Sequence, residues 1–380
     1  MPFCPLPFTH LNIKHEGKVS ACWRYPDKLG DYRKETLTEI WNSSEIKELR
    51  RSMLEDDELP IGCRSCIDAE KSNSVSTRQQ ALKEYDVKVK QIEMPLEELK
   101  SIEVRFDNIC NLMCRHCSPD YSSMWEHGVK KDKALFDKMQ EFGTFRKEQN
   151  HINLTQNVID EVVDFAPHLN EILIAGGEPL IHDLHYDFIE RISEHGENIT
   201  LSYNSNLTKL TYKNKNILDL WKKFNRILLR VSLDGDRDIY DYVRTSKHLP
   251  QIEDNIKKVQ ELDNVHLSIT CTTSLLNITR FTNIINYVEE MGCNFHTSLV
   301  QYPRCLNIKL LPKHLKEKVT EDFYNIKTNN PNIHRYGQNV IDYMNSEDWS
   351  DEFHTFLDYS KSLDRYHKTD LFEVYPEFKL

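Results

Sequence analysis

The sequence has no apolar run near the roughly 20 residues that a membrane-spanning helix needs. It also lacks a basic start, because the chain opens Met1-Pro2-Phe3-Cys4-Pro5, and this proline-rich beginning argues against an ordinary signal peptide. Positive charge is not in excess either. The formal net charge is −11, whereas a broad nucleic-acid-binding face needs clustered Lys and Arg. We therefore expect a cytoplasmic protein that binds neither membranes nor a long nucleic acid.

Cysteine, in contrast, is abundant and unevenly placed. The chain has ten cysteines, and seven of them lie within the first 117 residues. In a cytosolic chain this number indicates metal binding more than disulfides. Cys271, Cys293 and Cys305 are scattered through the remainder, and we interpret them as structural.

Strands alternate with helices from about residue 101 onward. Amphipathic stripes at helical spacing separate six short strand-like segments, which are 101–106, 171–175, 199–203, 226–233, 265–271 and 294–300. Repeated β–α units require a parallel sheet with right-handed crossovers. Six units fit an open doubly wound sheet or an incomplete barrel. In both, functional groups gather at the carboxyl ends of the strands.

The pattern divides the chain into three predicted domains. Residues 1–95 form a small cysteine-rich domain, in which apolar stretches predict a hairpin and residues 36–53 predict one helix. Residues 96–305 carry the α/β core. Residues 306–380 are polar, aromatic and helical in pattern, and we expect a helical C-terminal extension.

Cys110, Cys114 and Cys117 place three thiols within eight residues, directly after the first predicted strand. A structural zinc site needs four ligands, whereas three thiolates on one short loop leave one position vacant. A four-iron cluster held in this way keeps one iron free for another ligand. The spacing alone also fits a zinc site completed by His116 or by a distant cysteine.

This C-x3-C-x2-C loop, followed after the second strand by Gly176-Gly177-Glu178-Pro179, resembles the radical SAM superfamily over about residues 100–300. The resemblance implies a partial (β/α)6 TIM-like barrel and a [4Fe–4S] cluster on the three cysteines, whose free iron chelates S-adenosylmethionine (SAM). In that family, reductive cleavage of SAM gives a 5′-deoxyadenosyl radical that abstracts hydrogen from a substrate. His116 stands where the family usually has an aromatic residue near the adenine, and its ring can stack there as well.

Two polar segments after predicted strands are the next cofactor contacts that the resemblance implies. Gly-Gly lets the backbone approach a ligand closely, and the acid beside it suits the amine of SAM. Short amides and hydroxyls after the third strand suit ribose hydroxyls. The residues concerned are Gly176, Gly177, Glu178 and Pro179 for the amine, and Asn204, Ser205 and Asn206 for the ribose.

Ser232 ends the fourth predicted strand, and Arg244 follows it by twelve residues. This pair is similar to the Ser and Arg of peptide-modifying radical SAM enzymes, where they bind the SAM carboxylate, and an Arg fits a carboxylate bidentately. A surface ion pair is the alternative for Arg244. Asp234, on the turn after the same strand, is a candidate catalytic proton acceptor.

Cys4, Cys22, Cys63 and Cys66 make a set of four thiolates, the number that a closed cluster or a zinc ion needs. The C-x12-G-x4-C spacing and the sequence that leads to the later C-x2-C resemble SPASM/Twitch auxiliary-cluster domains. The family usually places this domain after the barrel, whereas here it comes first. The resemblance implies a second [4Fe–4S] cluster, and four cysteines fit zinc equally well.

Three functions follow from these resemblances. The first is radical SAM chemistry on a peptide or protein side chain, with an electron donor such as flavodoxin or ferredoxin. The second is the same chemistry on a nucleotide or another small metabolite. The third is a scaffold that binds zinc or a cluster and never cleaves SAM, but a scaffold has no need of residues 176–179 or Arg244.

Overall fold

The computed structural model describes residues 3–14, 16–56, 58–71, 75–85, 91–144, 154–328 and 330–379. The chain forms two compact units, of which the first comprises residues 1–107, 150–203 and 213–228, and the second comprises residues 108–149, 204–212 and 229–380. Among the described residues, no helix is both long and apolar enough to cross a membrane.

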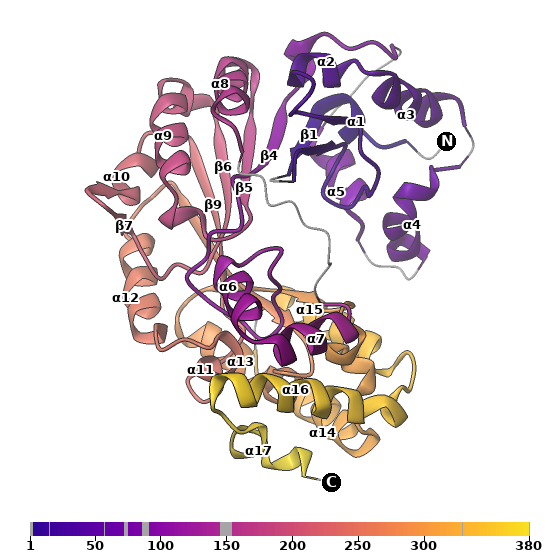
Figure 1. Cartoon of the computed structure of the whole chain (residues 1–380), viewed down its shortest axis with the longest axis vertical. Coiled ribbons are helices and arrows are strands. Elements are labelled where there is room, and N and C mark those ends of the chain that lie inside the picture. The colour runs from indigo at the N-terminus through magenta and orange to yellow at the C-terminus, as the bar shows by residue number, and fades with distance from the viewer. Residues whose placement is uncertain are drawn as a thin grey trace. The chain divides into compact units, whose positions relative to one another are not determined.

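The first unit contains three parallel strands of the predicted core. β4 (Ser101–Arg105) pairs with β5 (Glu171–Ala175), which pairs with β6 (Thr200–Ser205). One face of these strands is fully buried, with side chains such as Ile102, Ile172 and Leu201 at 0% exposure. α8 (Gln156–Phe165) and α9 (Asp183–Ile192) run alongside the strands (Figure 1). The apolar alternation that predicted these strands therefore marks the face that the helices cover.

The cysteine-rich N-terminal residues extend this sheet. After α1 (Leu6–Thr9), β1 (His10–Ile13) pairs antiparallel with β2 (Lys18–Ser20), which pairs with β3 (Gly30–Asp31), and this confirms the predicted hairpin. β1 also pairs in parallel with β4, with His10 opposite Ser101 and Asn12 opposite Glu103. This pairing joins residues on the two sides of position 95, and the domain boundary there stays a prediction.

The single helix predicted over residues 36–53 is wrong, because the structure has two. α2 (Leu37–Trp41) starts at a capping box in which Thr36 and Glu39 satisfy each other's backbone N–H groups. The Ser43 side chain then accepts a hydrogen bond from the Ile46 N–H and starts α3 (Ser44–Glu55). α4 (Arg64–Lys71) and α5 (Thr77–Glu84) complete this region.

The remaining strands of the core are β9 (Arg226–Ser232), β10 (Val265–Thr273) and β11 (Asn294–Leu299), and β10 pairs with β11 in parallel. The strand order of the whole sheet is β11-β10-β9-β6-β5-β4-β1-β2-β3, while β7 (Thr211–Tyr212) and β8 (Lys215–Asn216) form a separate pair. The six predicted strands therefore follow one another across a mostly parallel sheet. This confirms the α/β fold class with its six β–α units.

Most of the described residues outside the strands form helices. α10 (Ile217–Trp221), α11 (Tyr240–Arg244), α12 (Leu249–Gln260) and α13 (Phe281–Glu290) lie between strands in the sequence. α6 (Ser123–Lys131) and α7 (Lys133–Glu141), which the sequence analysis did not predict, follow the cysteine loop. The C-terminal residues form α14 (Lys313–Tyr324), α15 (Pro331–Asn345), α16 (Phe353–His367) and α17 (Leu371–Val374), as the helical pattern predicted.

Candidate functional site

The cysteine loop lies in the second unit and is anchored by its own backbone and by α6. The Cys117 N–H donates to the Cys114 carbonyl at 2.9 Å. The Trp125 indole N–H donates to the same carbonyl at 2.9 Å. Burial, followed by the charges of Cys114 and Cys110, raises the pKa of the Cys117 thiol. The three sulfurs therefore lie close enough to repel one another as thiolates, and a bound cation would offset that repulsion.

Arg115, within this loop, is a site residue that the sequence analysis missed. Its side chain is 0% exposed. Its guanidinium lies 2.8 Å from Asp364 and stacks over the ring of Tyr242 at 3.6 Å. The Tyr359 hydroxyl donates to the Arg115 carbonyl at 3.2 Å. The C-terminal helix α16 thus holds the cysteine loop, and no local sequence signal points to a partner about 250 residues away.

Asp234 lies just after β9, is fully buried and joins several predicted residues. Arg244 Nη1 donates to Asp234 Oδ2 at 2.7 Å, and His116 Nε2 lies 3.3 Å from the same oxygen. The Thr272 N–H donates to the other oxygen at 2.6 Å. Burial acts to raise the pKa of Asp234, but these contacts outweigh it and the pKa lies below its usual value. A low pKa makes a carboxylate a weak base. Its predicted role as proton acceptor stays a prediction, and this geometry favours orienting Arg244.

Two nitrogens in this cluster have no hydrogen-bond partner within the described part of the chain. They are Arg244 Nε and His116 Nδ1, both buried. Burial acts to lower the pKa of Arg244, but the charges of Cys114 and Asp234 hold it well above its usual value, so this guanidinium lies near the cysteine loop. A buried guanidinium N–H without an acceptor is costly. Arg244 is therefore suited to an anionic ligand beside the loop.

The segment after β6 is tied to the cysteine loop within the second unit. Asn206 Nδ2 donates to Asn111 Oδ1 at 2.9 Å, and Asn111 Nδ2 donates to Thr208 Oγ1 at 2.9 Å. Ser205 Oγ accepts from the Leu207 N–H, which fixes the turn. Asn204 and Ser205 are the last residues of β6 rather than residues beyond it. Ser232 likewise ends β9, as predicted, and is half-buried.

The Gly-Gly segment lies in the first unit, directly after β5. Gly176 and Gly177 have φ of +84° and +53°, values that L side chains rarely adopt. A Cβ on Gly176 would come within 3.1 Å of the Arg105 side chain. The Glu178 carboxylate is buried and accepts from the Leu180 N–H at 3.2 Å, and Pro179 begins the short helix that follows. The loop therefore needs both glycines for its own geometry.

A buried pair that the sequence analysis missed lies in the same unit. Asp107 Oδ2 and His182 Nε2 are 2.5 Å apart, and His182 stacks on Phe106 with ring centroids 5.6 Å apart. His182 Nδ1 accepts from the Leu184 N–H at the start of α9. The pair connects the end of β4 to the start of α9. Because α9 follows the Gly-Gly segment in the sequence, the pair helps to hold the C-terminal end of that segment in place.

The four N-terminal cysteines meet around one small cavity in the first unit. Cys4, Cys22, Cys63 and Cys66 line it together, alongside the side chain of Arg78. Burial raises the pKa of Cys4 to about 12 and that of Cys63 to about 12, and the neighbouring thiols add to both shifts. The structure thus brings together the set that the spacing predicted.

Both cysteine sets fit an iron–sulfur cluster. Within the described ranges, no three His, Cys, Asp or Glu side chains form a group that could hold a metal ion. The four N-terminal thiols surround one cavity, and four thiolates are the number that a closed four-iron cluster or a zinc ion needs. At the second set, Arg244 Nε has no partner among the described residues and is suited to a carboxylate.

Two family descriptions match the chain. Residues 104–282 match the radical SAM superfamily, and residues 4–67 match the SPASM iron–sulfur cluster-binding domain. No curated protein matches the chain. The first match implies a [4Fe–4S] cluster with SAM, and the second implies an auxiliary iron–sulfur cluster.

Solved structures with a similar chain include anSMEcpe with bound AdoMet, at 17% identity and a TM-score of 0.39 over 60% of this chain and 61% of that one. Another is Streptococcus suis SuiB bound to precursor peptide SuiA, at 12% identity and a TM-score of 0.39 over 74% of this chain and 63% of that one. The chain thus spans about three fifths of the length of these proteins. The chain therefore contains a region that matches the radical SAM superfamily over residues 104–282, with an SPASM match over residues 4–67 before it in the sequence.

Proposed function

We propose that this chain is a radical SAM enzyme that modifies a peptide or protein side chain. The observation that carries the proposal is the buried cluster beside the cysteine loop, in which Asp234 holds Arg244 at 2.7 Å and leaves its Nε without a partner. A purely structural ion pair has no need to leave a buried donor unsatisfied. The peptide class rests on the SPASM match and on the Ser232/Arg244 pairing.

In this proposal, each set of predicted residues binds either the cluster or one part of SAM. Cys110, Cys114 and Cys117 hold the SAM cluster, and Arg244 takes the SAM carboxylate, oriented by Asp234. Residues 176–179 bind the amine of SAM, residues 204–206 bind its ribose, and His116 stacks on its adenine. When bound, the cluster and SAM supply a 5′-deoxyadenosyl radical that removes a hydrogen atom from the substrate.

The N-terminal site serves electron transfer in this proposal. Four cysteine ligands leave no iron open to a substrate, so a cluster there exchanges electrons rather than binding the substrate through iron. A reduced flavodoxin or ferredoxin supplies the electron for SAM cleavage. A substrate-induced change in the ligand set of the auxiliary cluster, seen by its spectrum, would contradict this role.

The deciding experiment is anaerobic reconstitution with iron and sulfide, followed by SAM and a strong reductant. We expect 5′-deoxyadenosine and about eight irons per chain, two four-iron clusters. Cys114→Ala should abolish 5′-deoxyadenosine while the protein stays folded. Cys305→Ala is the matched control, since Cys305 is also buried but lies outside both cysteine sets. Cleavage that survives in the Cys114 variant would overturn the cluster assignment.

Iron content and SAM binding separate the remaining outcomes. A protein with about eight irons that binds SAM and gives 5′-deoxyadenosine only with substrate present would be an enzyme whose cleavage waits for its substrate. A protein with full iron that does not bind SAM would be a scaffold. Product formed from a nucleotide but from no peptide would move the substrate to the small-metabolite class.

A further inference from the structure

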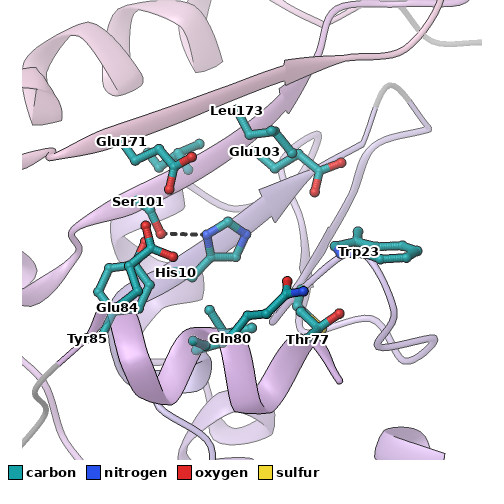
Figure 2. Close-up of a pocket in the computed structure, with 14 residues that line it drawn as sticks. His10, Trp23, Thr77, Gln80, Glu84, Tyr85, Ser101, Glu103, Glu171 and Leu173 are labelled. Atoms are coloured by element: carbon teal, nitrogen blue, oxygen red, sulfur yellow. Dashed lines mark hydrogen bonds between the residues drawn. The ribbon is translucent and has the colours of Figure 1, made fainter. Parts of the chain in front are cut away.

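A second cavity in the first unit lies between α5 and the sheet, beside the auxiliary cysteines. We name it the α5 pocket. Figure 2 shows residues of α5 on one side, among them Gln80, with His10 and the strand residues opposite. The space between its lining residues measures about 650 Å³, a volume that includes open solvent at the mouth of the pocket. Cys22 lines both this pocket and the cavity of the four cysteines.

The strand register explains why the sheet side of the pocket is polar. His10 is level with Ser101, and Ser101 is level with Glu171. One step further along the strands, Glu103 is level with Leu173. Residues paired in a parallel sheet point to the same face. Two carboxylates and an imidazole therefore stand on the face opposite the apolar residues that α8 and α9 cover.

Most of these polar atoms already have a partner, but one carboxylate oxygen does not. His10 Nδ1 and Ser101 Oγ are 2.7 Å apart, and Ser202 Oγ donates to Glu171 at 2.6 Å. Arg105 donates to Glu103 Oε1 at 2.9 and 2.7 Å. Glu103 Oε2 has no hydrogen-bond partner within the described residues, although Glu103 is only 1% exposed. Burial of an unsatisfied carboxylate oxygen is costly, so this oxygen is suited to a donor from a ligand.

The charge of the lining favours a cation. Glu84, Glu103 and Glu171 line the pocket, and none of the lining residues in the described part of the chain is a Lys or Arg. Arg105, outside the lining, offsets one of these charges. Burial lowers the pKa of His10 to about 4, so His10 adds no positive charge near neutral pH. The described lining therefore carries carboxylates and no side chain that is cationic near neutral pH.

The rest of the lining suits the apolar stem of a long cationic side chain. Leu6, Ala81 and Leu173 supply apolar surface. Trp23 is 47% exposed at the pocket and already carries Arg24 over its ring, 4.0 Å from the centroid. Indole rings attract cations through their faces, and long basic side chains pack their methylene groups on apolar surface.

We propose that the α5 pocket binds an amine or guanidinium on an apolar stem, as carried by a Lys or Arg side chain of a peptide substrate. Glu103 Oε2 and Glu171 receive the cation, and the apolar side chains receive its stem. Because Cys22 lines both cavities, the bound group lies next to the auxiliary cysteines. The peptide identity of the ligand rests on the proposed function, whereas the preference for a cation rests on the pocket alone.

The test is calorimetric titration of the holoprotein without reductant, so that no turnover occurs. The probes are Nα-acetyl-lysine amide, Nα-acetyl-arginine amide and Nα-acetyl-norleucine amide, which keeps the stem but has no cation. We expect the two cationic probes to bind at least tenfold more tightly than the norleucine probe. Glu103→Gln should weaken the cationic probes about tenfold and leave the norleucine probe unchanged.

Because Glu103 is buried, Glu103→Gln alone does not separate lost binding from disturbed folding, and a second variant at an exposed position of the same pocket makes that distinction. Glu84 is exposed on α5, and Glu84→Lys reverses a charge at the pocket without disturbing the core. It should weaken the cationic probes several-fold, whereas Glu261→Lys, at an exposed position outside the lining, should not. Equal affinity for lysine and norleucine probes, or wild-type affinity in both pocket variants, would overturn the proposal. Cation binding without 5′-deoxyadenosine formation would overturn only the proposed function, and the reverse result would overturn only the pocket.

Discussion

At the scale of single residues, Arg244 allows a direct test, because it is buried and its Nε has no partner among the described residues. Arg244→Lys keeps the charge but loses the planar fork and the Nε donor. We expect SAM affinity, measured by equilibrium binding without reductant, to fall tenfold or more, with the melting temperature little changed. Arg237→Lys is the matched control, because Arg237 follows the same strand but is 63% exposed and pairs with Glu253 at 2.8 Å. Equal SAM affinity in the two variants would remove Arg244 from the SAM site.

A second prediction at this scale concerns His185, whose buried ring contacts Tyr203 Oη at 2.9 Å. Burial, and then His182, lowers its pKa from 6.5 to about 3. Between these values the unfolded chain binds a proton that the folded chain does not, so stability falls as the pH falls, by up to about 1.4 kcal/mol per pH unit. His185→Phe should remove this share of the slope in denaturant unfolding between pH 7 and pH 5. An unchanged slope would mean that His185 takes up its proton equally in both states.

Residues with a local sequence signal can be predicted, whereas residues whose partners are distant in the sequence cannot. The cysteine sets stand out by their spacing, and Arg244 was predicted from its resemblance to the arginine of peptide-modifying radical SAM enzymes. Nothing in the local sequence around Arg115 distinguishes it from an arginine on the surface. Only the fold brings Asp364 to it, and His182 to Asp107. The sequence also does not predict that Glu103 Oε2 lacks a hydrogen-bond partner among the described residues, because this depends on which strands pair beside Glu103.

At the scale of elements, α16 supports the cysteine loop through the Arg115–Asp364 contact. Removing one charge leaves a buried guanidinium poorly compensated, which costs about 3 kcal/mol. Asp364→Asn should therefore lower the unfolding free energy by about that amount and speed the loss of iron from the SAM cluster. Asp358→Asn, on the same helix, breaks an ion pair with Lys138 that is 49% exposed at the aspartate, and should cost less than about 1 kcal/mol. Equal effects of the two changes would contradict a supporting role for α16.

The strands were predictable because each carries its own apolar pattern and a turn at its end, as β5 does over residues 171–175. The parallel pairing of β1 with β4 was not, since the pattern of a strand states which face is buried but not which neighbour it takes. The break between α2 and α3 was also missed. Apolar spacing continues through it, and the only local signal is Ser43 as an N-cap.

At the scale of the whole molecule, the two cysteine sets belong to different compact units. Cys110, Cys114 and Cys117 lie in one, and the four N-terminal cysteines lie in the other. Because all the cysteines of each set lie within one unit, each cluster should assemble without its counterpart. The combined change Cys63→Ser and Cys66→Ser should therefore lower the iron content from about eight to about four per chain, the content of a single four-iron cluster.

The same variant distinguishes the tasks of the two centres. SAM binding should persist, because all proposed SAM ligands lie outside the N-terminal set, whereas turnover of a substrate that needs the auxiliary centre for electron transfer should stop. Iron counting, SAM binding and 5′-deoxyadenosine formation on one preparation give the three readouts. If iron fell to zero, the sets would be interdependent and the N-terminal cysteines would be part of the folding of the core. If iron stayed near four in the wild-type protein as well, with zinc present, the N-terminal set would hold zinc, and electron transfer through it would be excluded.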